Sequence, residues 1–231
     1  MTKRWIVLLL VSLCASAVLA QVPTYTIHDI RTGLVPEGTQ LNVNGAIVTA
    51  VRYNGFSCTD PAAGPYTAIW VYTSVDPAVV PGDVVDIMDA NYQEYYGLSE
   101  LNMTTYSGTW TVVGSAPVPA LVMTLADVQA DDEAWESHVI TLTDGFMVTE
   151  LLNYGQWNAT SADSGLVLMN DDYFFDSSVL QVGDCYNGVV GMYTYSYGDY
   201  KLNPLADGLM LVDCAVANDS VSFSRVKALY R

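Results

Sequence analysis

The chain has 231 residues and a formal net charge of −17, because 25 acidic residues outnumber 8 basic ones. Such an excess of negative charge repels phosphate backbones and disfavours duplex nucleic acid as a partner. Hydrophobic residues make up 51% of the chain, which suffices for one large core or for two of ordinary size.

The first 20 residues have the pattern of a signal peptide. Lys3 and Arg4 precede an apolar run that ends in small residues, and we expect cleavage after Ala20. This run is too short to cross a bilayer and no longer run follows it, so we expect no membrane span after cleavage. The sequence therefore predicts a protein that is secreted or held at the cell surface.

The pattern of the next hundred residues predicts a short helix followed by strands. Residues 26–30 predict the helix, because Thr26 can cap its first turn and Asp29 lies near its positive end. Alternating or short apolar runs predict strands at 41–48, 68–72 and 84–88. Residues 80–83 predict the turn before the last of these strands, and the prolines of residues 115–120 predict a linker.

The same series of signals returns about 100 residues later. Residues 124–128 repeat the pattern of 26–30, Gly-Asp recurs at 183–184, and a Y-x3-Y-G-x3-L frame begins at both Tyr92 and Tyr193. Further strands are predicted at 139–142, 146–148, 166–169 and 189–193. We therefore predict an all-β protein of two tandem small β-barrels, each with one short helix and about five strands, because closure removes exposed sheet edges.

We place the first barrel at residues 21–117 and the second at 118–214, followed by a basic and aromatic tail at 215–231. The tail is interpreted either as a sorting or anchoring signal or as a frayed or docked terminal strand. Three cysteines follow the signal peptide: Cys58, Cys185 and Cys214. Three pairings are open, and we favour Cys185 with Cys214 because these two flank one β-rich region.

This order of signals resembles the tandem OB-fold-like regions of exported bacterial proteins. The resemblance rests on the T-I-x-D-I opening, the V-x-G-D turn, the Tyr-Gly hairpin and the exit at Leu202-Asn203-Pro204, and it covers residues 24–214. Such regions often lie beside extracellular nucleases of the endonuclease/exonuclease/phosphatase class, but we expect no nuclease domain in this chain. The shared motifs are structural, so the resemblance implies a fold and leaves the ligand open.

Aromatic side chains are the candidate ligand contacts, because flat rings can stack on sugars or unpaired bases. If the strands are regular, Tyr92 and Tyr96 lie on one face, and so do Tyr193 and Tyr197. Repetition of this frame in both halves favours a packing role for the tyrosines. A binding site at these four tyrosines and Trp157 is the alternative.

The sequence carries no recognisable catalytic signature. Neither His28 nor His138 has a nucleophile at a familiar spacing, and the G-x-S-x-G, H-E-x-x-H and P-loop motifs do not occur. The chain also lacks a CxxC motif and a Cys/His cluster, which disfavours zinc. The acidic residues at 131–133 and at 171, 172 and 176 offer oxygen ligands for calcium, although solvated loop charge is the expected role. We expect neither catalysis nor a cofactor.

These observations predict a non-catalytic, exported binding or accessory module. Its ligand and partner are left open, with a polysaccharide or a surface protein as candidates. One alternative is an OB-fold nucleic-acid-binding protein associated with a separate extracellular nuclease. That function needs a positive groove, and Arg31, Arg52 and Lys201 are scattered along the sequence. The other alternative is an oligosaccharide-binding module, which an acidic and aromatic surface allows.

Overall fold

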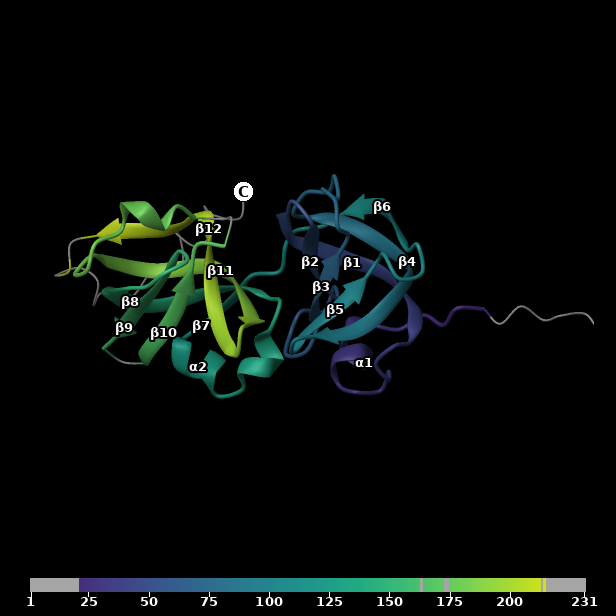
Figure 1. Ribbon diagram of the computed structural model, residues 1–231, viewed down its shortest axis with the longest axis horizontal. Helices are drawn as coiled ribbons and strands as arrows, with labels where there is room; N and C mark the ends of the chain where they lie inside the picture. The colour runs from purple at the N-terminus through teal and green to yellow at the C-terminus, as the bar shows by residue number, and fades with distance from the viewer. Residues whose placement is uncertain (1–20, 163, 173–174, 213, 215–231) are drawn as a thin grey trace, which may run out of the picture.

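The computed structural model describes residues 21–162, 164–172, 175–212 and 214, which form two barrels of β-strands side by side (Figure 1). The expected signal peptide, residues 1–20, and the tail at 215–231 lie outside the described residues. Within the ranges just given, no helix combines the length and the apolar character that a membrane crossing needs.

The first sheet follows the short helix α1 (Ile27–Arg31). Its strands are β1 (Gln40–Arg52), β2 (Gly55–Thr59), β3 (Ala68–Tyr72), β4 (Asp83–Tyr95), β5 (Leu98–Asn102) and β6 (Thr109–Ser115). They pair in the order β1-β2-β3-β5-β4-β6, with β3 and β5 parallel. Because β1 also pairs with β4, five of the strands close into a barrel and β6 extends the sheet beyond β4.

The second sheet repeats the topology of the five barrel strands, but its sixth strand, β7, pairs in parallel with β8. Its elements are β7 (Leu121–Met123), α2 (Leu125–Gln129), the 3₁₀ turn η1 (Asp132–Trp135), β8 (Val139–Leu151), β9 (Gln156–Ser161), β10 (Gly165–Asn170), the 3₁₀ turn η2 (Ser177–Val179), β11 (Cys185–Ser196) and β12 (Asp199–Val212). The order is β11-β12-β10-β9-β8-β7, with β10 and β12 parallel and β11 also pairing with β8. The all-β, OB-fold-like class that the sequence predicted is confirmed.

Both predicted helices form and have the same cap. The Thr26 hydroxyl accepts a hydrogen bond from the backbone N–H of Asp29 at 3.0 Å, and Thr124 accepts one from Asp127 at 3.2 Å. In each helix the Asp carboxylate accepts the backbone N–H of the capping threonine in return. This reciprocal pairing satisfies two N–H groups that a short helix would otherwise leave open.

The two Gly-Asp turns are also equivalent. Gly82 and Gly183 have φ values of +94° and +97°, which glycine adopts without a steric penalty. Their N–H groups donate to the carbonyl oxygens of Val48 and Val148, both at 2.8 Å. The repeat in the sequence therefore corresponds to a repeat of backbone geometry, which places each long strand (β4 and β11) at the same point of its barrel.

Each barrel has its own apolar interior. Phe56 fills the first and Trp157 and Tyr186 fill the second, all with side chains that are fully or almost fully buried. Ile27 of α1 and Leu125 of α2 are likewise buried among these residues, so each helix contributes to the core of its own barrel. Burial of such side chains supplies most of the folding free energy of small barrels.

One strand prediction was wrong in its boundaries. Residues 139–142 and 146–148 were predicted as separate strands, but both belong to β8. The intervening Asp144-Gly145 has the composition of a turn. Asp144 is instead held within the strand, where its carboxylate accepts the backbone N–H of Leu125 at 2.8 Å and so supports the start of α2.

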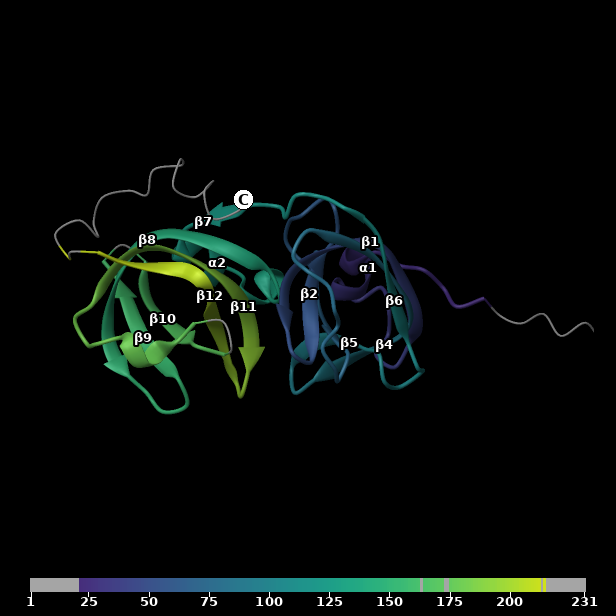
Figure 2. The ribbon, with the colours of Figure 1, turned by 90° about the horizontal axis from the view of Figure 1, so that it is seen from above.

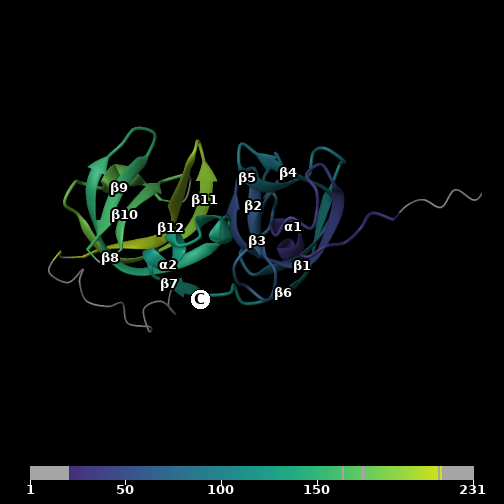
Figure 3. The same cartoon turned by 90° about the horizontal axis from the view of Figure 1, so that it is seen from below.

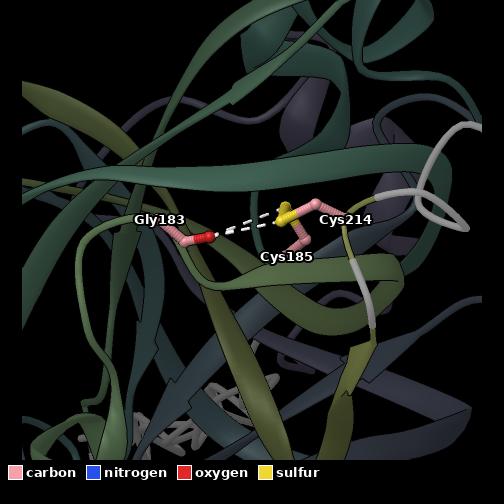
Figure 4. Close-up of a disulfide and its surroundings, with 3 residues drawn as sticks. All are labelled: Gly183, Cys185 and Cys214. Carbon is pink, nitrogen blue, oxygen red and sulfur yellow. Dashed lines mark hydrogen bonds between the residues drawn. A yellow bond between two sulfur atoms is a disulfide. The ribbon is translucent and has the colours of Figure 1, made fainter.

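A disulfide joins Cys185 at the start of β11 to Cys214, the pairing that the sequence favoured (Figure 4). The carbonyl oxygen of Gly183 lies 3.3 Å from the Cys214 sulfur. Cys58 is a free thiol buried in the first barrel. The bridge therefore closes the end of the β11–β12 hairpin and leaves the other barrel untouched.

Candidate functional site

The two barrels lie next to each other (Figures 2 and 3). Their junction has a packed zone and an open zone. The packed zone has an apolar centre made by Ala50 and Trp70 of the first barrel with Val139, Val190 and Met192 of the second. All five side chains are buried. Removing this surface from water favours a fixed arrangement of the barrels.

A buried ion pair lies in the packed zone. The Arg31 guanidinium of α1 donates to the Glu136 carboxylate and, at 2.6 Å, to the Glu133 carbonyl oxygen. The same Glu136 oxygen accepts the backbone N–H of Ser99 at 3.1 Å. Burial raises the pKa of Glu136 to about 8, although the positive charge of Arg31 acts in the opposite direction.

The segment around η1 supplies the other polar contacts of the packed zone. The backbone N–H of Tyr66 donates to the Ala134 carbonyl oxygen at 2.7 Å, and the Thr67 hydroxyl lies 3.2 Å from Nε2 of His138. Burial lowers the pKa of His138 to about 4, so the imidazole is neutral near pH 7. His138 therefore has a structural place between the barrels.

The acidic cluster at 131–133 is used inside the fold. Its carboxylates accept hydrogen bonds from tyrosine hydroxyls, in the pairs Asp131 with Tyr66, Asp132 with Tyr193 and Glu133 with Tyr200. Nowhere in the described part of the chain do three His, Cys, Asp or Glu side chains converge as a metal site would require. Asp131 thus bonds to the first barrel, whereas Asp132 and Glu133 bond to tyrosines of their own barrel.

Beside the packed zone the junction opens into a cleft of about 1050 Å³. The first barrel lines it with the β1–β2 turn, β3, β5 and the end of β4; the second contributes the β8–β9 and β11–β12 turns, part of β11 and the residues after β10. Corresponding turns of the two barrels therefore face one ligand-sized space. Seven of the lining side chains are aromatic: Tyr53, Trp70, Tyr72, Tyr95, Tyr154, Phe175 and Tyr197.

The charges in the cleft have mixed signs. Arg52 of β1 crosses to Asp172 of the second barrel, with 2.7 Å between Nη2 and the carboxylate oxygen, and its guanidinium lies 5.7 Å from the centre of the Trp70 ring. Lys201 lies 5.4 Å from the Tyr197 ring. Cations that are scattered in sequence are thus gathered at the junction, so the separation of Arg52 and Lys201 along the chain was no guide to their positions in space.

Carboxylates nevertheless outnumber cations in the cleft, by four (Glu100, Asp171, Asp172 and Asp176) to two. Burial raises the pKa of Glu100, whose carboxylate accepts from the Gln93 amide at 2.7 Å. Burial also raises the pKa of Asp172, against the effect of Arg52. Asp171 accepts the Ser177 hydroxyl at 2.6 Å. The cleft is therefore acidic, and these carboxylates have partners within the protein.

Three tyrosines occupy the first position of Tyr-Gly turns. Tyr96, Tyr154 and Tyr197 have φ values of 52°, 60° and 55°, in the left-handed region that turn positions of this kind require. Their exposed fractions are 83%, 93% and 96%. Tyr154 and Tyr197 line the cleft, whereas Tyr96 lies outside its lining.

The expectation that the paired tyrosines share a strand face was wrong. β4 ends at Tyr95 and β11 at Ser196, so Tyr96 and Tyr197 lie in the turns. Tyr92 and Tyr193 are buried, as the packing interpretation expects, and burial is the main cause that raises both pKa values. Trp157 is fully buried as well. Of the five predicted contacts, only Tyr197 lines the cleft.

Sequence reasoning missed most of the cleft residues. Trp70 and Tyr72 lay in a predicted strand, but the sequence did not show which face of that strand is buried. It also gave no sign of the residue that pairs with Arg52. Tyr154 did have a signal, because Tyr-Gly at 154–155 repeats the dipeptides at 96–97 and 197–198 outside the offset of the main repeat. Neither His28 nor His138 lines this cleft.

No family model matches the sequence, and a search of curated proteins found no match either. Several solved structures resemble the fold weakly. Fission yeast Pot1, solved with ssDNA, is 10% identical at a TM-score of 0.34, covering 89% of this chain and 93% of that one. The p202 HIN1 domain, solved with a 12-mer dsDNA, is also 10% identical at a TM-score of 0.34, covering 77% and 93%. These similarities are too weak to support an argument about function.

Proposed function

We propose that this protein is a non-catalytic, exported binding module whose ligand occupies the cleft between the barrels. The observation that carries the proposal is the convergence of three hairpin turns, one from the first barrel and two from the second, on one aromatic space of about 1050 Å³. Clefts of this size between packed units are common ligand sites. In OB-folds, the loops that join the first two and the last two strands are the ones that contact ligands.

Export is supported by the leader-like segment at residues 1–20 and by the disulfide between Cys185 and Cys214, since disulfides persist outside the cytosol. The absence of catalysis is supported by the partners of the ionisable groups. Asp172 is paired with Arg52, and Glu100 accepts a hydrogen bond from Gln93, so neither is poised as a free acid or base. Burial raises the pKa of the Cys58 thiol, which leaves it unreactive.

The test compares retention of the protein on three probes: a single-stranded oligo(dT), insoluble cellulose or chitin, and whole bacterial cells. Ser196→Trp places a bulky ring in the cleft, whereas Val113→Trp places one on β6, outside the cleft. We expect the probe that retains the wild-type protein to retain Val113→Trp as well. Ser196→Trp should no longer be retained on it. Equal retention of both variants would show that the ligand binds elsewhere and would overturn the proposal.

A further inference from the structure

We infer that the cleft binds an uncharged oligosaccharide, which stacks on Tyr154 and Tyr197 and spans both barrels. The inference rests on the proposed function, because it names the ligand class of the same cleft. Its support comes from three separate features of the described residues: the backbone conformation of the turn tyrosines, the balance of charge, and the polar groups of the lining.

The first feature is the placement of aromatic rings where the backbone disfavours them. Tyr154 and Tyr197 have positive φ values in turns that usually hold Asn, Asp or Gly. Their side chains are 93% and 96% exposed, so burial in the fold does not offset this unfavourable conformation. Tyr96 shares this conformation outside the cleft, so it is the position of Tyr154 and Tyr197 in the cleft lining that makes them candidate ligand contacts.

The second feature is the charge balance, four carboxylates to two cations, which disfavours anionic ligands. Four carboxylates repel the phosphates of a nucleic acid. A cationic peptide meets Arg52 and Lys201, and the carboxylate of Asp172 is already paired with Arg52. An uncharged polyhydroxylated chain encounters neither repulsion. The C–H face of a sugar ring also offers an aromatic side chain an apolar surface to stack against.

The third feature is the polar lining between the rings. It includes the carboxamides of Asn54, Asn102, Gln156 and Asn170 and the hydroxyls of Ser137, Thr194 and Ser196. Carboxamides and hydroxyls can both donate and accept, as sugar hydroxyl groups do. A sugar that enters the cleft therefore meets partners for both kinds of hydrogen bond.

A glycan array that carries uncharged, sulfated and sialylated oligosaccharides tests the inference, with oligo(dT) and hexalysine measured in parallel by calorimetry at physiological salt. The protein is used as a full chain with its disulfide formed. We expect binding to uncharged glycans. Tyr154→Asn and Tyr197→Asn should each weaken that binding about tenfold, the range for loss of one aromatic stacking contact.

Tyr96→Asn is the matched control. It changes the same residue type at the same kind of strained turn, but Tyr96 does not line the cleft. We expect Tyr96→Asn to bind glycans as the wild type does. We also expect Tyr154→Asn to melt at or above the wild-type temperature, because asparagine tolerates a positive φ better than tyrosine. This result would separate loss of binding from loss of folding.

The outcomes distinguish this inference from the proposed function. If oligo(dT) or hexalysine binds and the two cleft variants weaken it, the cleft is a binding site but the ligand class is wrong. If uncharged glycans bind equally well to all three variants, stacking on these tyrosines is wrong. If no probe binds in a way that depends on the cleft, both the inference and the proposed function fail.

Discussion

The packed zone and the cleft are two parts of one junction, and they differ in how far their charged side chains are exposed. In the packed zone, Arg31 and Glu136 are fully buried and bonded to each other across the barrels. In the cleft, Arg52 and Asp172 also pair across the barrels but keep 16% and 28% of their side chains exposed. The comparison indicates that the packed zone fixes the distance between the barrels, while the cleft keeps its groups accessible.

The largest effect is expected from breaking the packed zone. At about pH 9, above the folded Glu136 pKa of about 8, Arg31→Met leaves the buried carboxylate without its cation, and we expect the free energy of unfolding to fall by about 3–5 kcal/mol in denaturant titrations. Glu133→Gln is the control, because the Glu133 side chain is 45% exposed and its pairing should contribute no more than about 1 kcal/mol. Equal losses in the two variants would contradict the central role of the Arg31–Glu136 pair.

A somewhat smaller loss is expected from removing the disulfide, which lies outside both zones. It links residues 29 positions apart, and closing a loop of that length stabilises a fold by about 3–4 kcal/mol. We expect the double variant Cys185→Ser/Cys214→Ser to lose that amount in thermal and denaturant unfolding while retaining any ligand of the cleft. Loss of binding at a temperature where the variant remains folded would show that the bridge shapes the site.

The pH dependence of stability tests the buried carboxylate. The pKa of Glu136 is about 8 in the folded protein, above the value of about 4.3 for an unfolded chain. The folded state therefore holds this proton more tightly, and stability should decrease as pH rises between those values, by at most about 1.4 kcal/mol per pH unit.

Buried His138 has the opposite effect below its unfolded pKa of about 6.5, because burial lowers its folded pKa to about 4. The window from about pH 6.5 to 8 thus isolates Glu136 from His138. We expect unfolding free energies of the wild type to decline across that window and those of Glu136→Gln to decline less. The same slope in both proteins would exclude Glu136 as its source.

The smallest effect is expected at the turns. Tyr96→Asn relieves an unfavourable backbone conformation outside the cleft, and we expect the protein to gain up to about 1 kcal/mol of stability. Thermal unfolding of the pure variant measures this gain. The Tyr96 ring makes an edge-to-face contact with the Tyr95 ring, with 4.8 Å between the ring centroids. A clear loss of stability would mean that this contact stabilises the protein by more than the turn conformation destabilises it.

Local features were predictable from the sequence because neighbouring residues determine them. The caps at Thr26 and Thr124 and the turns at Gly82 and Gly183 formed as expected. The junction was not predictable, because Arg31 and Glu136 are 105 positions apart and only the packing of the barrels brings them together. The role of the tyrosines depended on where each strand ends, and a difference of one residue moves a side chain from a strand face into a turn.

Hydrogen exchange, measured with and without the probe that the protein retains, tests the location of the site most directly. We expect slower exchange at the three turns that line the cleft, within residues 53–55, 153–156 and 196–199. Slower exchange confined to other surfaces, such as β6, with these turns unchanged would contradict it.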